Sequence, residues 1–267
     1  MRRLTKRLVI LLTMSLLAAA IVAGSFIIPY ILMRRNTGAA STPRADAGRD
    51  WVILLHGIMR SPRSMFRIKQ ELEDNGFHVI NFGYRSTAKT IEESAAELKE
   101  VVDGIPDEGR TVNFVTHSLG AIVLRYYLAR NRPKGLGRIV MIAPPNKGSA
   151  LARILKNWFL YKWLFGAAGQ QVARSPKSLP VLLPPPRCEF GVIAGGMGDD
   201  EGVNPLIPGD DDMTVGVDET RLEGMSDFII IKGQHSSLLL QRQVIDNTLS
   251  FLKTGKFIYG DKRPVSP

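Results

Sequence analysis

The sequence contains very little cysteine, with Cys188 as the one thiol among 267 residues. A single cysteine cannot form a disulfide within the chain, which excludes a small disulfide-stapled scaffold and leaves packing to stabilise the fold. Hydrophobic residues make up 45% and charged residues 22%, a composition that excludes a disordered chain and allows a large buried core. The length fits one large domain.

Motifs for metals and phosphates are also missing. The sequence has no H-E-x-x-H motif and no pair of cysteines, so we expect no metal site. The glycine-rich residues 195–198 are not followed by a helical pattern, and a phosphate-binding loop requires one. We therefore expect no cofactor. The sequence shows no internal repeat.

The net charge of +10 is concentrated in two segments that hold few acidic residues. Residues 1–50 contain eight Lys or Arg and two Asp, and residues 147–187 contain seven Lys or Arg and no acid. The rest of the chain is therefore slightly acidic. Local basicity of this kind disfavours a general polyanion-binding surface, so we expect no nucleic-acid partner.

The first basic segment surrounds residues 8–33, which run for 26 residues without a charge. As a helix this run would be about 39 Å long, enough to cross a hydrocarbon core of about 30 Å. Four cations precede it and Arg34 and Arg35 follow it, which favours a cytoplasmic N-terminus. We predict an uncleaved signal anchor over residues 1–33, with the following domain on the non-cytoplasmic side, periplasmic or extracellular. A cleavable signal peptide remains the alternative, because small residues at 18–20 resemble a cleavage site.

Short apolar runs alternate with helical patterns after a polar linker over residues 34–50. This alternation predicts a mostly parallel sheet of about six strands with helices on both faces, within a domain over residues 51–257 and before a tail at 258–267. Strands are expected at 51–55, 79–84, 112–115, 139–142, 190–194 and 228–231, and helices at 61–75, 91–102, 120–130 and 238–253.

Residues 147–187 interrupt that alternation. Apolar residues from Leu151 to Phe159 have the spacing of one amphipathic helix. A nearly continuous apolar run and a proline-rich segment at 182–186 follow. We predict an insertion between two strands that forms a helical cap over the active site. Its cations and aromatic residues suit binding to a membrane surface; alternatively, its apolar face covers the pocket and its cations are only solvated.

The most informative motif is Thr116-His117-Ser118-Leu119-Gly120, which lies between a predicted strand and a predicted helix. A nucleophile elbow, G-x-S-x-G, requires this context, because the sharp turn exposes the serine hydroxyl above the sheet. Gly120 would allow the helix to pack closely against the strand, and Thr116 replaces the usual first glycine. The alternative is that Ser118 only caps an ordinary helix.

With these residues the chain resembles the α/β-hydrolase superfamily, especially its small bacterial lipases and esterases. The resemblance spans roughly residues 51–257 and includes Leu55-His56-Gly57-Ile58, the elbow, residues 143–149 and the acidic and histidine segments near the C-terminus. It implies a minimal α/β-hydrolase fold and the chain order nucleophile, acid, histidine. It also implies that the backbone N–H groups of Ile58 and Leu119 form an oxyanion hole.

Among four histidines, only His235 follows every acidic candidate, so we predict it as the base. His56 is expected to be structural, and His117 to point away from the nucleophile. Matching the family's acid loop to Val215, Val217 and Glu219 makes Asp212 the acid, with Met213 where glycine is common. Asp211 is the alternative acid, and the three consecutive acids at 210–212 are also compatible with a solvated turn or a calcium loop.

These residues predict a membrane-anchored serine hydrolase that cleaves carboxylic esters. Ser118 would be the nucleophile, His235 the base, and Asp212 the residue that orients the imidazole. Thioesterases, acyltransferases and amidases use the same triad, and a catalytically silent module that binds lipid or protein is a further alternative. We expect an ester or lipid substrate and a monomeric chain.

Overall fold

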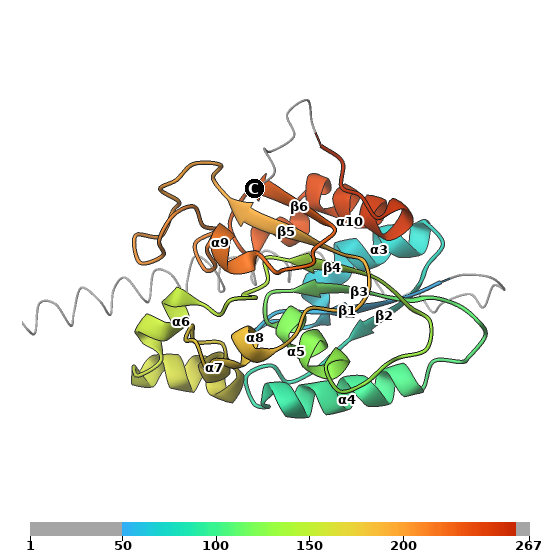
Figure 1. The fold of residues 1–267 in the computed structure, drawn as a ribbon, viewed down its shortest axis with the longest axis horizontal. Helices are drawn as coiled ribbons and strands as arrows, with labels where there is room; N and C mark the ends of the chain where they lie inside the picture. The colour runs from blue at the N-terminus through green and yellow to red at the C-terminus, as the bar shows by residue number, and fades with distance from the viewer. Residues whose placement is uncertain (1–49, 260–267) are drawn as a thin grey trace, which may run out of the picture.

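A computed structural model describes residues 50–259, which form one sheet covered by helices on both faces (Figure 1). The six strands have the order β2-β1-β3-β4-β5-β6, and every neighbouring pair is parallel. The predicted six-stranded parallel sheet is therefore confirmed. The strands are β1 (Trp51–Leu55), β2 (His78–Phe82), β3 (Val112–His117), β4 (Leu136–Ile142), β5 (Phe190–Gly196) and β6 (Asp227–Lys232).

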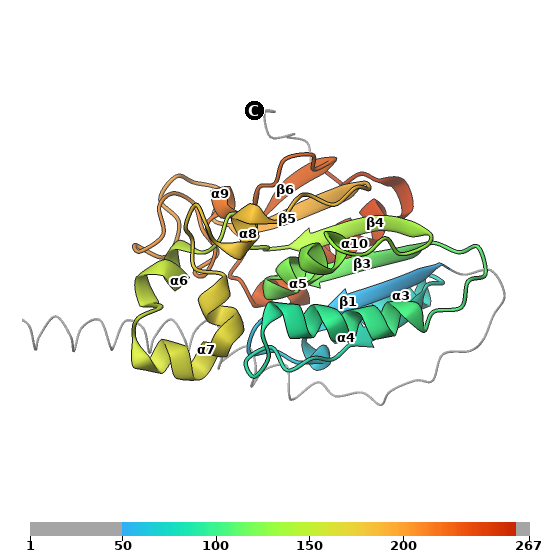
Figure 2. The same cartoon turned by 60° about the horizontal axis from the view of Figure 1, so that its bottom comes forward.

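Alternate side chains of each strand build two separate hydrophobic cores. In β1, Val52 and Leu54 pack with α3 (Phe66–Asp74) and α10 (Arg242–Thr254). Ile53 and Leu55 point to the opposite face and pack with α4 (Ile91–Asp103) and α5 (Leu119–Leu128), which lie in front of the sheet in Figure 2. Because successive side chains of a strand point to opposite faces, a strand buried on both sides must be apolar throughout.

The carboxyl ends of the parallel strands meet at one edge of the sheet, where open α/β sheets usually bind ligands. The loops after β1, β3, β5 and β6 all begin at this edge. The cap lies between β4 and β5 in the chain, and its helices α6 (Ala150–Leu155) and α7 (Phe159–Gln171) stand beyond the same edge (Figures 1 and 2). Shorter elements are η2 (Pro62–Met65), α8 (Leu179–Leu182), α9 (Val217–Thr220) and η3 (Ser237–Leu240).

The cap departs from the single amphipathic helix expected from Leu151 to Phe159. That expectation is wrong, because α6 ends at Leu155 and α7 begins at Phe159, after Trp158 adopts an extended conformation. The break lets both helices turn apolar residues toward the same cavity. A second break lies at Gly166, whose φ of 58° and ψ of −156° favour glycine. A Cβ atom there would overlap the carbonyl oxygen of Thr87.

The predicted signal anchor and nearly all of the linker lie outside the described residues, as does the tail from residue 260. Within residues 50–259, no helix is both long and apolar enough to cross a membrane.

The terminal helix was expected from residue 238, but a 3₁₀ turn occupies residues 237–240 and α10 starts at Arg242. Contacts with the body continue to Tyr259, whose hydroxyl donates to the carbonyl of Phe228 at 3.2 Å.

Candidate active site

Ser118 occupies the turn between β3 and α5, with a φ of 52° and a ψ of −121°. This conformation costs a non-glycine residue about 1–3 kcal/mol and is typical of functional sites. Its side chain makes no capping hydrogen bond to α5, so the interpretation of Ser118 as an ordinary helix cap is wrong. A Cβ atom on Gly120 would lie 2.6 Å from the carbonyl oxygen of Leu55, which confirms that glycine permits the close packing of α5.

A continuous series of hydrogen bonds joins Ser118, His235 and Asp212. The Ser118 hydroxyl donates to His235 Nε2 at 2.9 Å, and His235 Nδ1 donates to Asp212 Oδ2 at 2.6 Å. The three residues are 6%, 1% and 0% exposed. The structure thus brings together the three residues predicted as a triad. Their catalytic roles remain a prediction.

The carboxylate of Asp212 is held by its own loop. Its Oδ1 atom accepts hydrogen bonds from the backbone N–H groups of Thr214 at 3.0 Å and Val215 at 2.8 Å. The backbone N–H of His235 donates to the carbonyl of Asp212 at 2.8 Å. Because both carboxylate oxygens are engaged, the orientation of the carboxylate is fixed, and with it the imidazole tautomer whose Nε2 can accept a proton.

Asp211, the alternative acid, faces away from this series. It is fully buried, and its carboxylate accepts hydrogen bonds from the backbone N–H groups of Val203, Asn204 and Met213. Burial raises the pKa of the Asp211 carboxyl, against the effect of those N–H groups. The acidic run is therefore not a solvated turn at Asp211 and Asp212, and Asp211 stabilises the loop that carries Asp212.

Met213 occupies the position where the α/β-hydrolases that this chain resembles commonly have glycine. Its φ is 83°, in the left-handed region that a residue without Cβ adopts at little cost. The backbone of this loop therefore explains the usual glycine, and Met213 is strained there. Asp210, at the start of the same loop, accepts from the backbone N–H groups of Met197 at 2.7 Å and Gly198 at 3.0 Å.

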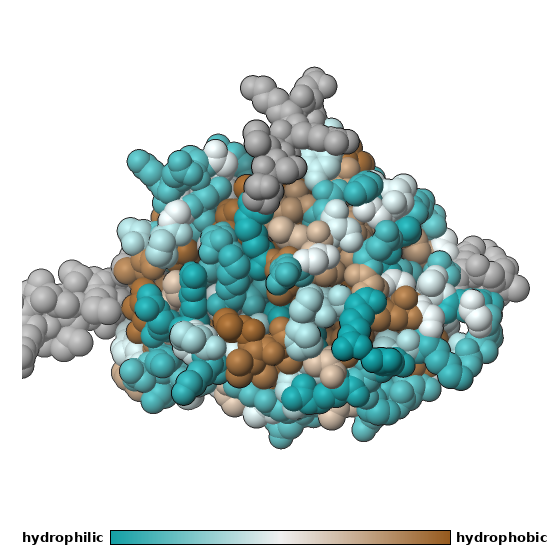
Figure 3. Space-filling model, viewed as in Figure 1, coloured by the Kyte–Doolittle hydropathy of each residue, from teal (hydrophilic) through white to brown (hydrophobic). Residues whose placement is uncertain are grey.

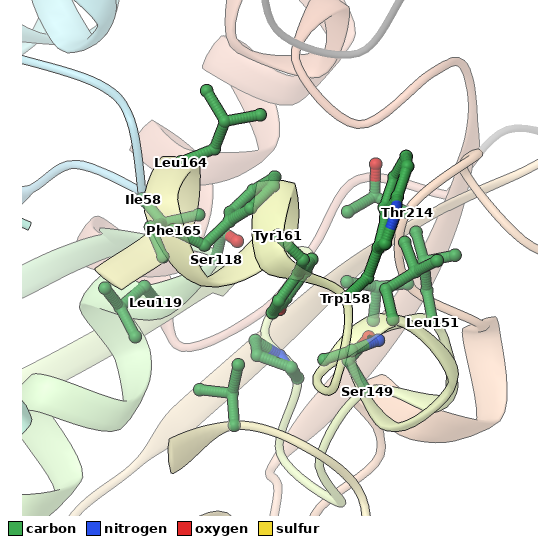
Figure 4. Close-up of a pocket in the computed structure, with 15 residues that line it drawn as sticks. Ile58, Ser118, Leu119, Ser149, Leu151, Trp158, Tyr161, Leu164, Phe165 and Thr214 are labelled. Carbon is green, nitrogen blue, oxygen red and sulfur yellow. Dashed lines mark hydrogen bonds between the residues drawn. The ribbon is translucent and has the colours of Figure 1, made fainter. Parts of the chain in front are cut away.

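Ile58 and Leu119, the residues expected to provide the oxyanion hole, both line the cavity at Ser118 (Figure 4). Leu119 begins α5, and the first N–H groups of a helix have no acceptor within it. Gly57 allows the loop after β1 to approach the elbow: a Cβ atom on it would lie 2.8 Å from His117 Nδ1 and 3.1 Å from Ser118 Cβ. The backbones of both residues therefore flank the serine, and their role as donors stays a prediction.

Two buried residues, His117 and Arg60, lie beside His235. Sequence reasoning predicted no role for Arg60 and, for His117, only that it points away from the nucleophile; the ring of His117 instead reaches the backbone of His235. His117 Nε2 donates to the backbone carbonyl of His235 at 3.1 Å, and the two rings lie 4.8 Å apart. Burial, together with the nearby His235 and Arg60, lowers the pKa of His117 well below its usual value. Arg60 donates to the Ser236 hydroxyl, and burial lowers its pKa to about 10. Both residues support the His235 loop, through contacts that sequence spacing could not indicate.

His56 takes the structural place expected of it. Its ring stacks on Tyr84 at a centroid distance of 4.3 Å, and its backbone carbonyl accepts from the Tyr84 hydroxyl at 2.5 Å. Burial lowers the pKa of the imidazole. These contacts link the ends of β1 and β2 and leave His56 outside the hydrogen-bond series of Ser118.

An almost wholly apolar cavity opens at Ser118 beneath the cap (Figure 4). Most of its wall comes from the cap, that is from α6, α7 and the residues that flank them, and the rest comes from the loops at the carboxyl edge of the sheet, including Thr214 and Val215 of the acid loop. Such a cavity suits the hydrocarbon part of a ligand whose polar group lies at the serine. The cap residues that line it include Leu151, Leu155, Trp158, Tyr161, Leu164 and Phe165.

The cap is attached to the acid loop through α9 at two places, before α6 and after α7. The buried carboxylate of Glu219 accepts from the backbone N–H of Ala150 at 2.7 Å and from Arg174 at 3.4 Å. Lys147 pairs with Asp218 at 2.8 Å. Burial raises the pKa of Glu219, against the effect of its hydrogen bonds. The start of the cap and the segment that follows α7 are thereby fixed close to the residues that hold Asp212.

No cluster of His, Cys, Asp and Glu in the described part of the chain is arranged to hold a metal ion.

Comparison by sequence gives one family model, a domain of unknown function (DUF7379), which matches residues 33–164. No curated protein matches the chain.

Several solved structures share the architecture at low sequence identity. The mature lipase BlEst2 of Bacillus licheniformis is 18% identical, with a TM-score of 0.57 over 79% of this chain and 93% of its own. The metagenomic carboxyl esterase MGS0156 is 17% identical, with a TM-score of 0.55 over 76% and 69%. Phospholipase PlaB of Legionella pneumophila is 18% identical, with a TM-score of 0.53 over 71% and 53%. At such identities the likeness establishes the fold and leaves the activity open.

Proposed function

We propose that this chain, which has the fold of the α/β-hydrolase superfamily, is a serine hydrolase that cleaves carboxylic esters. The predicted resemblance to that superfamily is confirmed for the fold. The observation that carries the proposal is the hydrogen-bond series from Ser118 through His235 to Asp212. The Ser118 end of this series lies at an apolar cavity.

In the proposed acylation step, Ser118 Oγ attacks the ester carbonyl carbon while His235 Nε2 accepts the hydroxyl proton. Asp212 stabilises the imidazolium that forms. The backbone N–H groups of Ile58 and Leu119 would donate to the carbonyl oxygen as it becomes an oxyanion. His235 then returns the proton to the leaving alkoxide, and the acyl group remains on Ser118.

In the proposed deacylation step, water takes the place of the alcohol. His235 accepts its proton, the hydroxide attacks the acyl carbon, and the protonated His235 returns the proton to Ser118. The apolar wall formed by α6 and α7 favours an acyl group with a hydrocarbon chain over a charged one. The substrates we propose are therefore esters with an apolar acyl part, lipids included.

A fluorophosphonate probe tests the proposal directly, because it phosphonylates an activated serine. We expect the purified full chain in detergent to be labelled at Ser118, as identified by mass spectrometry, and Ser118→Ala to remain unlabelled. Ser149→Ala is the matched control, since Ser149 lines the same cavity without contacting His235. Equal labelling of Ser118→Ala and the unsubstituted protein would contradict the assignment.

We further propose that residues 1–33 anchor the enzyme in a membrane with the catalytic domain on the non-cytoplasmic side. The uncharged run at 8–33 and the stronger cationic flank before it support this orientation. Alkaline phosphatase fused after Pro267 should be active, and a fluorescent protein that folds only in the cytosol should be dark there. The reverse pattern would exclude the proposed orientation.

A further inference from the structure

Helix α7 carries apolar side chains on two faces. Tyr161, Leu164 and Phe165 line the cavity at Ser118, whereas Phe159 and Trp163 are 70% and 78% exposed. Phe159 and Trp163 stand four residues apart and therefore lie next to each other on the helix surface. Packing of the cap on the body accounts for the inner face, but it does not account for the outer aromatic pair.

Exposed apolar residues continue on the other two cap helices. Ile154 of α6 and both Val181 and Leu182 of α8 are exposed. Together with the α7 pair they are five of the six large hydrophobic residues exposed among residues 50–259. Figure 3 shows a hydrophobic area over α8 and beside α7, bordered by hydrophilic residues. A concentration of exposed apolar residues in one part of the chain, here the three cap helices, marks an interaction surface.

The charges of the cap itself have a single sign, since it contains seven Lys or Arg and no acid. Lys147 and Arg174 pair with the acids of α9. Arg153, Lys156 and Lys162 are exposed and form no ion pair with a described residue. These three cations and the five exposed apolar residues are called the cap surface below.

We propose that the cap surface binds an anionic lipid bilayer. Aromatic and aliphatic side chains beside cations are the composition that places a helix at the boundary between headgroups and acyl chains. The aromatic pair of α7 would enter that boundary, and Arg153, Lys156 and Lys162 would contact lipid phosphates. A second copy of the chain is the less suitable occupant, because it would bring two surfaces of the same charge together.

The length of the linker supports the same occupant. Residues 34–50 comprise 17 residues, which span at most about 60 Å when extended. With residues 8–33 in a bilayer, the body remains within that distance of the lipid. Each cation near an anionic bilayer surface then contributes to docking, and the tether removes most of the cost of bringing the cap to the membrane.

Docking would place α7 between the bilayer and the cavity. Its outer face would meet lipid headgroups while its inner face lines the space at Ser118. This consequence rests on the proposed function, because it makes esters within the same bilayer the substrates nearest to Ser118. Binding of the cap surface to lipid does not depend on that function.

A fluorophore on the cap measures docking in the full chain. Asn157 is exposed between α6 and α7, so Asn157→Cys in a Cys188→Ser background gives one labelling site. The labelled protein is reconstituted in phosphatidylcholine vesicles with and without phosphatidylglycerol. We expect the emission to shift to shorter wavelength only with phosphatidylglycerol, and the shift to diminish at high ionic strength.

Substitutions in the cap surface should weaken this emission shift, and substitutions elsewhere should not. Replacing Arg153, Lys156 and Lys162 by Gln should lower the docking equilibrium about fivefold for each cation. Phe159→Ser with Trp163→Ser should abolish the shift. The matched controls are Ile258→Ser, which among residues 50–259 is the large exposed hydrophobic residue outside the cap, and Gln at the exposed cations Arg132, Lys232 and Lys256. Both controls should dock normally.

Three results would overturn the proposal. They are an emission independent of phosphatidylglycerol, a cap triple variant that docks normally, and a shift that follows protein concentration, which would indicate a second copy. Fluorophosphonate labelling of the same samples separates the two proposals. Docking without labelling of Ser118 would contradict the proposed function alone, and labelling without docking would contradict the cap surface alone.

Discussion

The loops at the carboxyl edge of the sheet and the cap above them are held in different ways. Asp212 and Asp211 are completely buried, and backbone N–H groups of their own loop hold both carboxylates. The cap is tied to α9 through Lys147, Ala150 and Arg174, and its inner apolar side chains pack into the hydrophobic core of the body, with Gly166 against Thr87 and Gln171 at the start of α4. Its outer face leaves Phe159 and Trp163 in solvent.

The two regions therefore differ in how closely their geometry must be maintained. A serine, a base and an acid must keep their geometry to within a fraction of an ångström, which needs side chains fixed by packing and hydrogen bonds. A cavity wall made of Leu, Phe and Trp needs only volume and apolar character, so it tolerates substitution. Changes at the sheet edge should therefore alter the rate of the chemical step, and changes in the cap should alter which substrate is accepted.

The largest expected effect is at the nucleophile and the base. Ser118→Ala and His235→Ala should each lower kcat for ester hydrolysis by about 10⁴-fold or more, because neither proton transfer nor acylation can proceed. Steady-state kinetics with a chromogenic ester measure the loss. The double variant should lose no more than either single one, and an additive loss would show that the two residues do not act as a unit.

The two buried aspartates should differ in kind. Asp212→Asn should lower kcat strongly, though about 10- to 100-fold less than Ser118→Ala, because the serine and the imidazole remain. Asp211→Asn should leave kcat nearly unchanged and lower the free energy of unfolding by about 1–3 kcal/mol, because its backbone donors lose a charged acceptor. Kinetics with urea unfolding of each variant distinguish them. Greater loss of kcat in Asp211→Asn would make Asp211 the acid.

Gly57→Ala should disturb the elbow without touching the substrate cavity wall. The new Cβ would lie 2.8 Å from His117 Nδ1, which must move, and 3.1 Å from Ser118 Cβ, which must give by a few tenths of an ångström. We therefore expect kcat to fall, by less than the roughly 10²-fold that a misplacement of about 1 Å costs. Gly104→Ala is the control, since its Cβ would meet nothing closer than 3.4 Å. Equal kcat in both variants would contradict a tightly fixed elbow.

In the cap, one substitution on α6 should change specificity and its neighbour should not. Leu155 lines the cavity, while Ile154 points to solvent. Leu155→Ala should change the ratio of kcat/KM between long and short acyl esters by about 10-fold, because a methylene in an apolar site is worth about that much. Ile154→Ala should leave the ratio unchanged. A series of nitrophenyl esters of increasing chain length measures both.

The smallest expected effect is at Met213. Met213→Gly relieves a φ of 83° and should raise the free energy of unfolding by about 1 kcal/mol, with activity unchanged. Glu223 lies in an exposed loop and does not have a positive φ. Glu223→Gly should therefore lower the free energy of unfolding by about 0.5–1 kcal/mol. Thermal unfolding monitored by circular dichroism measures both. A destabilised Met213→Gly would show that the Met213 side chain contributes more than its strain costs.

Local patterns in the sequence determined the sheet and most of its covering helices. The inner strands β1, β3, β4 and β5 are largely buried on both faces, and α4 carries its own capping box at Thr90 and Glu93, so these elements are specified within a few neighbouring residues. Ser118 could be found because the strand, turn and helix around it are contiguous. His235 followed from its position after the acids, which depended on the resemblance to a known family.

Only the tertiary structure decided the features that depend on residues far apart in the chain. Asp211 and Asp212 are adjacent and chemically identical, and His235, 23 positions beyond Asp212, contacts only the second. The break between α6 and α7 could not be read from apolar spacing, because that spacing continues through Trp158 and the shared cavity requires the turn. The contact of His117 with His235 spans 118 positions. Sequence periodicity reports which face of an element is apolar, whereas packing determines what that face meets.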